Sequence, residues 1–179
     1  MATSSLPMRK VLVIGSGGSG KSTFATRLAE HTGLPVIHLD AHFWKPGWVE
    51  PTHEEWDETV AQLASGEAWI MDGNYSRTLE QRLAACDTVI FLDRPRLLCL
   101  ARVIWRRIRY HRRARPDMGQ DCTERLDWEF IRWIWNYPAT HRSKILQRLA
   151  ELPPGQRAIV LRTQADIENF LRSLPPIGT

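Results

Sequence analysis

Cysteine is scarce in this chain, and its few copies are poorly placed for pairing. The 179 residues include three cysteines, Cys86, Cys99 and Cys122, an odd number with no Cys-x-x-Cys spacing. A disulfide-stabilised fold and a structural zinc site both rely on dense or closely spaced cysteines, so neither is expected. Unpaired thiols are typical of a reducing compartment, and we therefore expect a cytoplasmic protein.

Long apolar runs are also missing. No stretch approaches the ~20 apolar residues that a membrane-spanning helix needs, so we expect no membrane partner. No apolar segment with a cleavage site lies near the N-terminus, and secretion is not expected. An apolar fraction of 43% with 25% charged residues is ordinary for a globular protein, and low-complexity tracts are absent. We expect residues 1–179 to form a single domain.

Basic residues are in modest excess but are unevenly placed. Of the 24 Lys and Arg residues 20 are arginines, and nine of these lie between Arg94 and Arg115 with no acidic residue among them. The planar fork of donors in arginine matches phosphate oxygens, so such a cluster is typical of phosphate recognition. A solvated basic face and a nucleic-acid patch are the alternatives, and neighbouring motifs have to distinguish them.

Short apolar runs alternate with helical patterns along the chain. We expect strands at residues 10–14, 35–39, 68–71, 88–92 and 157–161. We expect helices at residues 21–33, 52–65, 77–85, 94–113, 124–137, 140–151 and 165–174, with Pro138 interrupting the run after 137. Thr52 and Glu55 have the spacing of a capping box at the start of one helix. Ligands of parallel sheets bind beyond the carboxyl ends of the strands, where Asp40, Asp72 and Asp93 fall.

A glycine-rich loop follows the first expected strand. Gly15-Ser-Gly-Gly-Ser-Gly20-Lys21-Ser22 matches GxxxxGK[ST] in full and opens the next helix, which is the context that this motif requires. Its backbone N–H groups can point inward at phosphate oxygens, and the helix N-terminus adds a positive end. We expect Lys21 to reach the phosphates of ATP and Ser22 to bind Mg²⁺. The expected ATP-binding residues of the loop are Gly15, Gly17, Gly18, Ser19, Gly20, Lys21, Ser22 and Thr23.

These patterns together predict an α/β fold of the three-layer P-loop NTPase type, similar to nucleotide kinases. It would have a five-stranded parallel sheet, helices on both faces and a small Arg-rich lid. Residues 112–123 lack apolar periodicity between two helices, so we expect a lid insertion over 110–123. Residues 41–67 are the expected acceptor-side segment.

The segment after the third expected strand resembles a motif of adenylate kinases. It reads Asp72-Gly-Asn-Tyr-Ser-Arg77-Thr78, and it is similar to the Asp-Gly-Phe-Pro-Arg-Thr segment of that family, with Asn-Tyr-Ser in place of Phe-Pro. In adenylate kinases the Asp supports the magnesium shell and the Arg clamps the phosphate of the acceptor. The resemblance implies these roles for Asp72 and Arg77. A simple turn role for Asp72 is the alternative, because Asp-Gly favours turns.

Arginines share one face of the expected helix 94–113. They are Arg102, Arg106, Arg109 and Arg113, with Leu97, Ala101, Ile104 and Ile108 opposite. Residues 100–107 resemble the adenylate-kinase helix that enters the lid, whose two arginines contact the nucleotide. That role is carried over to Arg102 and Arg106. We expect Arg115 to lie in the lid, and one or both of Arg125 and Arg132, which follow it, to close on the phosphates.

A broader resemblance runs from Val11 to Leu171. It is carried by Asp40-Ala-His-Phe-Trp44-Lys-Pro-Gly-Trp48, Ile70-Met-Asp-Gly-Asn-Tyr75, Arg115-Pro-Asp-Met-Gly and Trp128-Glu-Phe-Ile-Arg-Trp-Ile-Trp135. These segments are similar to bacterial topology modulation proteins, which are P-loop proteins grouped with adenylate kinases. The family name records an effect on DNA supercoiling, so DNA is a second class of partner to consider.

The acceptor side offers a carboxylate and several indole rings. Asp40 can accept the proton of an acceptor hydroxyl as a general base, and capping of the strand end is the alternative. Trp44, Trp48 and Trp56 can stack on a base. Trp128, Trp133 and Trp135, at helical spacing, are expected to pack in the core or lid. The histidines show no paired metal-ligand spacing.

The primary prediction is transfer of the γ-phosphoryl group of ATP to a nucleotide or other small acceptor. The predicted catalytic residues are Lys21, Arg106, Arg115, Arg125 and Asp40, the acceptor-binding residues Asp40, Trp44 and Arg77, and the Mg²⁺ residues Ser22 and Asp72. A kinase for a non-nucleotide hydroxyl would share the ATP side and depend on Asp40. The alternative class is a nucleotide-dependent, DNA-associated regulator or ATPase. We favour the kinase because the arginines gather where the lid is expected.

Overall fold

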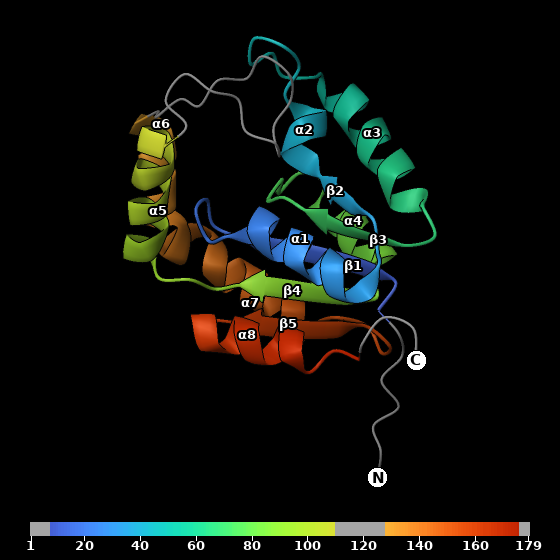
Figure 1. The fold of residues 1–179 in the computed structure, drawn as a ribbon. Helices are drawn as coiled ribbons and strands as arrows, with labels where there is room; N and C mark the ends of the chain where they lie inside the picture. Colours follow the sequence, from blue (N-terminus) through green and yellow to red (C-terminus); the bar gives the residue numbers. More distant parts are fainter. Residues whose placement is uncertain (1–7, 110–127, 176–179) are drawn as a thin grey trace.

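The computed structural model describes residues 8–109 and 128–175. Five strands form one sheet, β1 (Lys10–Gly15), β2 (Val36–His38), β3 (Trp69–Asp72), β4 (Thr88–Leu92) and β5 (Arg157–Leu161). Their order is β2-β3-β1-β4-β5, and every pairing is parallel (Figure 1). This arrangement confirms the predicted α/β P-loop fold.

Helices cover both faces of the sheet. They are α1 (Lys21–Thr32), α2 (Leu39–Phe43), α3 (His53–Ser65), α4 (Leu79–Ala85), α5 (Arg96–Arg109), α6 (Trp128–Tyr137), the π-helical turn η1 (Pro138–Arg142), α7 (Ser143–Ala150) and α8 (Gln164–Arg172). Within the described ranges no helix is long and apolar enough to cross a bilayer.

Alternation along the strands builds two core layers. Val11 and Val13 of β1 point to the face covered by α1 and α8, where they pack with Leu28. Leu12 and Ile14 point to the opposite face, which α3, α4 and α7 cover. Because both faces are buried, the inner strands read as nearly continuous apolar runs rather than as alternating patterns. Because all five strands are parallel, their carboxyl ends lie at the same edge of the sheet, where β1 leads into the glycine-rich loop.

Two local predictions were wrong. Strand β2 ends at His38, and Asp40 lies in the first turn of α2, a short helix that the apolar pattern did not indicate. Pro138 does not interrupt the chain, because the helical path continues through η1 into α7. Proline has no amide hydrogen to donate to the preceding helical turn. In a π turn the hydrogen bonds join residues i and i+5, so the helix can continue past this position. The hydroxyl of Thr140 donates to the carbonyl oxygen of Asn136 in this turn, at 3.0 Å.

Candidate active site

The P-loop connects β1 to α1 and holds its lysine inward. Lys21 Nζ donates to the carbonyl oxygens of Gly15 and Ser16, both at 3.0 Å. Burial lowers the pKa of Lys21, while the charges of Asp40 and Asp72 raise it. The lysine therefore lies within electrostatic reach of both predicted acidic site residues, although Asp40 comes from α2 and Asp72 from the end of β3.

Helices α5 and α6 pack directly on the P-loop. A Cβ atom on Gly18 would lie 2.3 Å from the carbonyl oxygen of Cys99 in α5, and one on Gly17 would lie 2.5 Å from the ring of Phe130 in α6. Gly18 also has φ +74°, a left-handed conformation that favours glycine. The motif glycines thus serve the approach of two helices as well as the approach of phosphate.

The predicted arginines of α5 divide between two directions. Arg102 Nη1 donates to the carbonyl oxygen of Ser19 at 3.2 Å, which places its guanidinium at the P-loop. Arg106, one turn further, is near enough that its charge lowers the pKa of Lys21. Arg109 instead lies 5.0 Å from the ring centre of Trp105, on the outer side of the helix. Arg113, Arg115 and Arg125, with the predicted lid at 110–123, lie outside the described residues.

A second basic side chain lies beside Arg102. Nε and Nη1 of Arg94 are buried and have no hydrogen-bond partner among the described residues. Burial lowers the pKa of Arg94, and the charge of Arg102 lowers it further. The hydroxyls of Ser16 and Ser19 in the P-loop are likewise buried without a partner within the described ranges. Buried donors of this kind are costly unless a ligand meets them, so the loop and its surroundings fit a bound phosphate group.

Across the P-loop, Asp40 is held by a tyrosine. The hydroxyl of Tyr75 donates to Asp40 Oδ1 at 2.8 Å. Burial, followed by the charge of Asp40, raises the pKa of Tyr75, which therefore remains a neutral donor. The carboxylate of Asp40 is thereby oriented on the acceptor side of the loop.

Asp72 is paired with a histidine that the sequence analysis did not select. His38 Nδ1 lies 2.7 Å from Asp72 Oδ1, and the aspartate is 4% exposed. A carboxylate only accepts, so Nδ1 carries the hydrogen of this bond. The signal was present in the topology, because His38 and Asp72 end neighbouring parallel strands and are direct register partners.

The indole rings of the acceptor side have different environments. Trp56 is 3% exposed and packs against Phe43 and Tyr75, at ring-centre distances of 4.9 and 4.8 Å. It therefore belongs to the core and does not offer a face for stacking, contrary to the prediction. Trp44 and Trp48 are half-buried neighbours at 5.0 Å, and they remain the candidates for contact with an acceptor.

Arg77 is engaged outside the acceptor site. Its Nε and Nη2 donate to the two carboxylate oxygens of Asp57 in α3, at 3.0 and 2.7 Å. Arg82, which the sequence analysis passed over, is fully buried and donates to the carbonyl oxygens of Gly73, Tyr75 and Thr78. Burial lowers the pKa of Arg82 to about 10. Arg82 thereby fixes the backbone of the loop that carries Tyr75. Its position in the short helix α4 gave no indication in the sequence that it would be buried.

Asp93, the third acidic residue at a strand end, makes contacts that hold the fold together. It accepts from Nε and Nη2 of Arg142 at 2.8 and 2.9 Å and forms an ion pair with Arg162 at 3.3 Å. It thereby ties η1 and the turn after β5 to the end of β4.

The predicted Mg²⁺ residues, Ser22 and Asp72, are too few to form a complete metal site by themselves. Within the described ranges no group of three or more His, Cys, Asp or Glu side chains could hold a metal ion. Mg²⁺ in phosphoryl-transfer sites is usually bound by one or two protein groups plus phosphates and waters, so Ser22 and Asp72 suit that ion.

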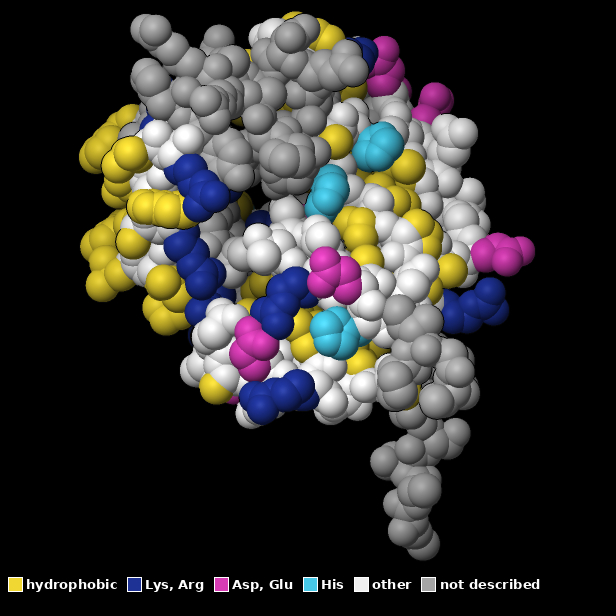
Figure 2. All heavy atoms as spheres, viewed as in Figure 1, with side chains coloured by type: hydrophobic (Ala, Val, Ile, Leu, Met, Phe, Trp, Pro, Cys, Tyr) yellow, Lys and Arg dark blue, Asp and Glu magenta, His cyan; other side chains and the backbone are white. Residues whose placement is uncertain are grey.

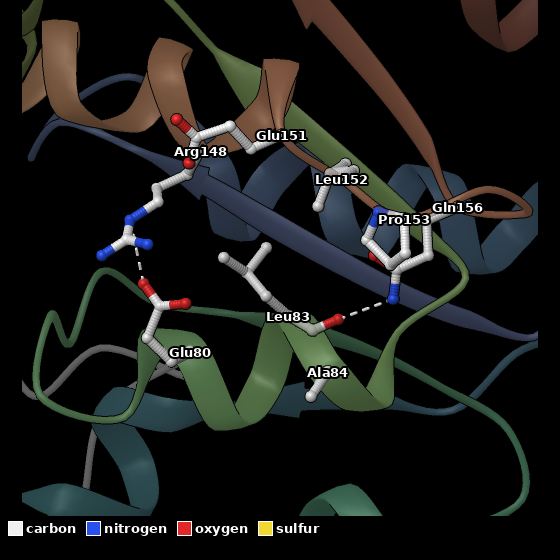
Figure 3. A pocket seen from close by; sticks show the side chains of 8 residues that line it. All are labelled: Glu80, Leu83, Ala84, Arg148, Glu151, Leu152, Pro153 and Gln156. Atoms are coloured by element: carbon white, nitrogen blue, oxygen red, sulfur yellow. Dashed lines mark hydrogen bonds and ion pairs between the residues drawn. The ribbon is translucent and has the colours of Figure 1, made fainter.

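A small pocket lies away from this constellation, between α4 and α7 (Figure 3). It measures about 260 Å³ and is lined in part by Glu80, Leu83 and Arg148. Glu80 and Arg148 form an ion pair of 3.1 Å across it, and Gln156 Nε2 donates to the carbonyl oxygen of Leu83 at 2.8 Å. These contacts join α4 to α7 and to the turn before β5, and we assign the pocket no part in catalysis.

Comparisons with known proteins show the fold. No family model and no curated protein matches the sequence. The structure is similar to shikimate kinase from Acinetobacter baumannii in complex with shikimate, with TM-score 0.57 and 16% identity over 92% of this chain and 89% of that chain. It is also similar to shikimate kinase from Bacteroides thetaiotaomicron, with TM-score 0.50 and 15% identity over 93% and 96%. The resemblance to topology modulation proteins is not confirmed by any of these comparisons. The chain has the fold of P-loop kinases.

Proposed function

We propose that this chain is an ATP- and Mg²⁺-dependent phosphotransferase that transfers the γ-phosphoryl group of ATP to a small acceptor. The observation that supports the proposal is that basic side chains and two carboxylates lie close together at the P-loop. Lys21, Arg102 and Arg106 gather on the loop, and Asp40 and Asp72 lie within electrostatic reach of Lys21. Phosphoryl transfer depends mainly on such positioning and on fixed cationic donors, which makes this arrangement suitable for the reaction.

Each residue has a role in this proposal. Lys21 exchanges the carbonyl oxygens of the P-loop for phosphate oxygens, and Arg102 and Arg106 balance the charge of the transferring group. Ser22 and Asp72 hold Mg²⁺, which neutralises phosphate charge when bound, and His38 orients Asp72. Asp40, oriented by Tyr75, accepts the proton of the acceptor group.

We further propose that the chain works as one kinase domain. Residues 41–67 form its acceptor-side segment and residues 110–123 its lid. In this arrangement Arg115 and Arg125 complete the catalytic set from segments outside the described residues. Closure of such a lid would exclude water and limit wasteful ATP hydrolysis.

The described acceptor side favours a hydroxyl acceptor over a nucleotide. The arginine predicted to clamp an acceptor phosphate, Arg77, is already bound by Asp57. The remaining candidates for contact with the acceptor are the oriented carboxylate of Asp40 and the half-buried rings of Trp44 and Trp48, which suit a compact hydroxylated molecule. A nucleoside monophosphate remains the second acceptor class, and it would require Arg77 to leave Asp57.

The DNA-associated alternative is less well supported. Arg102 and Arg106 turn toward the P-loop rather than toward a flat outer surface. A DNA-binding switch would instead show slow acceptor-independent hydrolysis and a steep dependence of DNA affinity on salt.

An acceptor screen tests the proposal. ADP release from Mg-ATP is measured with a panel of nucleoside monophosphates and small hydroxyl compounds, and the phosphorylated product is identified by mass spectrometry. We expect at least one hydroxyl compound to stimulate ADP release and to appear phosphorylated. Lys21→Ala should lose this activity while keeping its thermal transition, and Lys144→Ala, a change of an exposed lysine in α7, should behave as wild type. Acceptor-independent ADP release throughout the panel, or full activity of Lys21→Ala, would contradict the proposal.

A further inference from the structure

The outward side of α5 is apolar. Leu97 and Ile108 are 67% and 71% exposed, and Ile104 and Trp105 are exposed as well. On the adjacent helix α6, Trp128 and Trp135 are also exposed, so the prediction of core or lid packing is supported only for Trp133, which packs against Phe130. We call the set Leu97, Ile104, Trp105, Ile108, Trp128 and Trp135 the α5/α6 apolar face.

Helical geometry explains why this face cannot turn inward. Cys99 and Val103 of α5 are buried against Ile134 of α6, and Arg102 is anchored on the P-loop. With 3.6 residues per turn, these contacts leave Leu97, Ile104 and Ile108 together on the opposite side. Soluble monomers rarely expose a contiguous apolar patch of this kind, and such patches usually mark a binding surface.

Arginines border the α5/α6 apolar face. Arg96 lies 4.0 Å from the ring centre of Trp135, and Arg109 lies 5.0 Å from that of Trp105, so guanidinium groups sit at its margin. Arg132 of α6 is also exposed, and the two helices together contain a single acidic residue, Glu129. Figure 2 shows hydrophobic side chains gathered along the left edge of the molecule, where α5 and α6 lie, with Lys and Arg side chains next to them.

We propose that the α5/α6 apolar face binds the surface of an anionic lipid bilayer, although the lack of a membrane-spanning run led us to expect no membrane partner. An apolar stripe bordered by arginines and bearing exposed tryptophans is the pattern of helices that lie in the membrane interface. The apolar side chains enter the boundary of the acyl chains, and the arginines pair with acidic headgroups. Within the described residues neither α5 nor α6 is long enough to span a bilayer, so we expect both helices to lie on its surface.

Charge and shape argue against other occupants. A second copy of this chain would bring an identical face, which is also bordered by arginines, against this one, and like charges repel. An acidic protein helix would need a groove to enter, whereas these side chains protrude at the edge of the molecule (Figure 2). A lipid surface supplies negative charge and an apolar layer together, without requiring a groove.

The face is independent of the phosphotransferase proposal. It lies on the side of α5 opposite Arg102, so a lipid surface would leave the P-loop accessible. A failure of lipid binding and a failure of phosphoryl transfer can therefore be told apart.

Vesicle binding by the full chain tests the inference. Co-sedimentation and tryptophan fluorescence are measured with phosphatidylcholine vesicles that contain or lack phosphatidylglycerol. We expect binding and a blue shift with the anionic vesicles, and at least ~10-fold weaker partitioning to the neutral ones, since each arginine near the surface contributes about fivefold. Arg132→Gln should weaken binding by about that fivefold factor.

Substitutions on the exposed face separate specific from general effects. Ile108→Glu and Leu97→Glu place charge on exposed positions and should retain the fold, while reducing partitioning by ~10-fold or more. Val49→Glu, at an apolar position that is 55% exposed elsewhere, should bind as wild type. Absence of binding to anionic vesicles, or unchanged binding of Ile108→Glu, would overturn the inference. A wild-type dimer in sedimentation that Ile108→Glu dissociates would also overturn it, in favour of a second copy.

Discussion

The buried environment of Asp72 favours a role in the site over a role in a turn. It is almost fully buried, it accepts from His38, and its charge reaches Lys21. A buried carboxylate costs free energy unless it is hydrogen-bonded and paired, and these two neighbours provide both forms of stabilisation. A residue that served only as a turn would not need them.

We predict that Asp72→Asn raises the Mg²⁺ concentration needed for half-maximal activity by about 10-fold, with a smaller change in ATP affinity. Asparagine still accepts from His38, so the substitution removes the charge and keeps the hydrogen bond. A magnesium titration at saturating ATP measures the effect. His38→Ala is the complementary control, because it removes the hydrogen bond and keeps the charge. Identical magnesium midpoints for Asp72→Asn and wild type would return Asp72 to a turn role.

The hydroxyl group of Tyr75 allows the role of Asp40 to be tested by removing a single atom. Tyr75→Phe removes the bond to Asp40 and keeps the ring packed against Phe43. Hydrogen bonds to charged groups contribute about 1.5–3 kcal/mol, so kcat/KM for the acceptor should fall by roughly 10-fold or more. The KM for ATP should not change. If steady-state kinetics showed the loss on the ATP side instead, Asp40 would not act on the acceptor.

Among the elements, the contact between the P-loop and α5 restricts substitution most severely. A methyl group at Gly18 would meet the backbone of Cys99, and backbone cannot move aside as a side-chain end can. The position of α5 is therefore coupled to the shape of the loop that binds phosphate.

We predict that Gly18→Ala abolishes nucleotide binding, measured by calorimetry with ATP. Gly33→Ala is a matched control, because Gly33 has a similar φ of +72° but no atom within 4 Å of an added Cβ. Each substitution carries the left-handed strain of about 1–2 kcal/mol, and only Gly18→Ala adds the collision. Equal loss of ATP binding in both variants would show that strain, rather than the contact with α5, is responsible.

The inner arginines of α5 should act mainly on the reacting state. We predict that Arg106→Ala reduces kcat by roughly 10²–10³, with a smaller change in ATP affinity, because fixed charge at a transferring phosphoryl group stabilises the transition state. Arg106→Lys should recover little, since an ammonium group lacks the planar fork. Arg109→Ala, an outward arginine of the same helix, should retain kcat. Normal turnover of Arg106→Ala with weakened DNA binding would instead favour the DNA-associated alternative.

At the scale of the whole molecule, an ion pair joins the two ends of the chain. Arg27 in α1 and Glu168 in α8 are 141 residues apart and make two bonds of 2.7 Å. The hydrogen bond from Arg27, with a further one from Gln164, lowers the pKa of Glu168 to about 2. The pair thereby holds α8 against α1, the helix that follows the P-loop.

The lowered pKa of Glu168 predicts the sign of a pH effect. Its folded pKa lies below its ordinary value of 4.5, so its stabilisation is present above pH 4.5 and is lost as the pH falls toward 2. In urea titrations over this range, the free energy of unfolding of Glu168→Gln should fall less with acidification than that of wild type. Glu151→Gln, a change of an exposed acid in another part of the surface, should follow the wild-type curve. A parallel decline in Glu168→Gln and wild type would show that the pair does not contribute.

Much of the fold was predictable because its signals are local. The five strands were placed within two residues of their observed bounds, and the capping box at Thr52 and Glu55 is present. The P-loop motif was recognised from its own residues and from the strand and helix beside it. The α2 helix and the passage through Pro138 were missed, because a five-residue helix and a π turn have no distinctive period.

The partners of the site residues were not predictable in the same way. The pairing of His38 with Asp72, the diversion of Arg77 to Asp57 and the buried contacts of Arg82 each depend on how strands and helices are ordered in space. An apolar stripe in a sequence is expected to face the core, yet in α5 the anchored Arg102 turns it outward.

By itself, the sequence determined the phosphate-binding loop, the alternation of strands and helices, and hence the P-loop fold, because these depend on the chemistry and period of neighbouring residues. Only the tertiary structure decided which charges face one another across that loop and which side of α5 is exposed. Contacts between residues far apart in the chain arise from strand order and helix packing, and no local pattern encodes them.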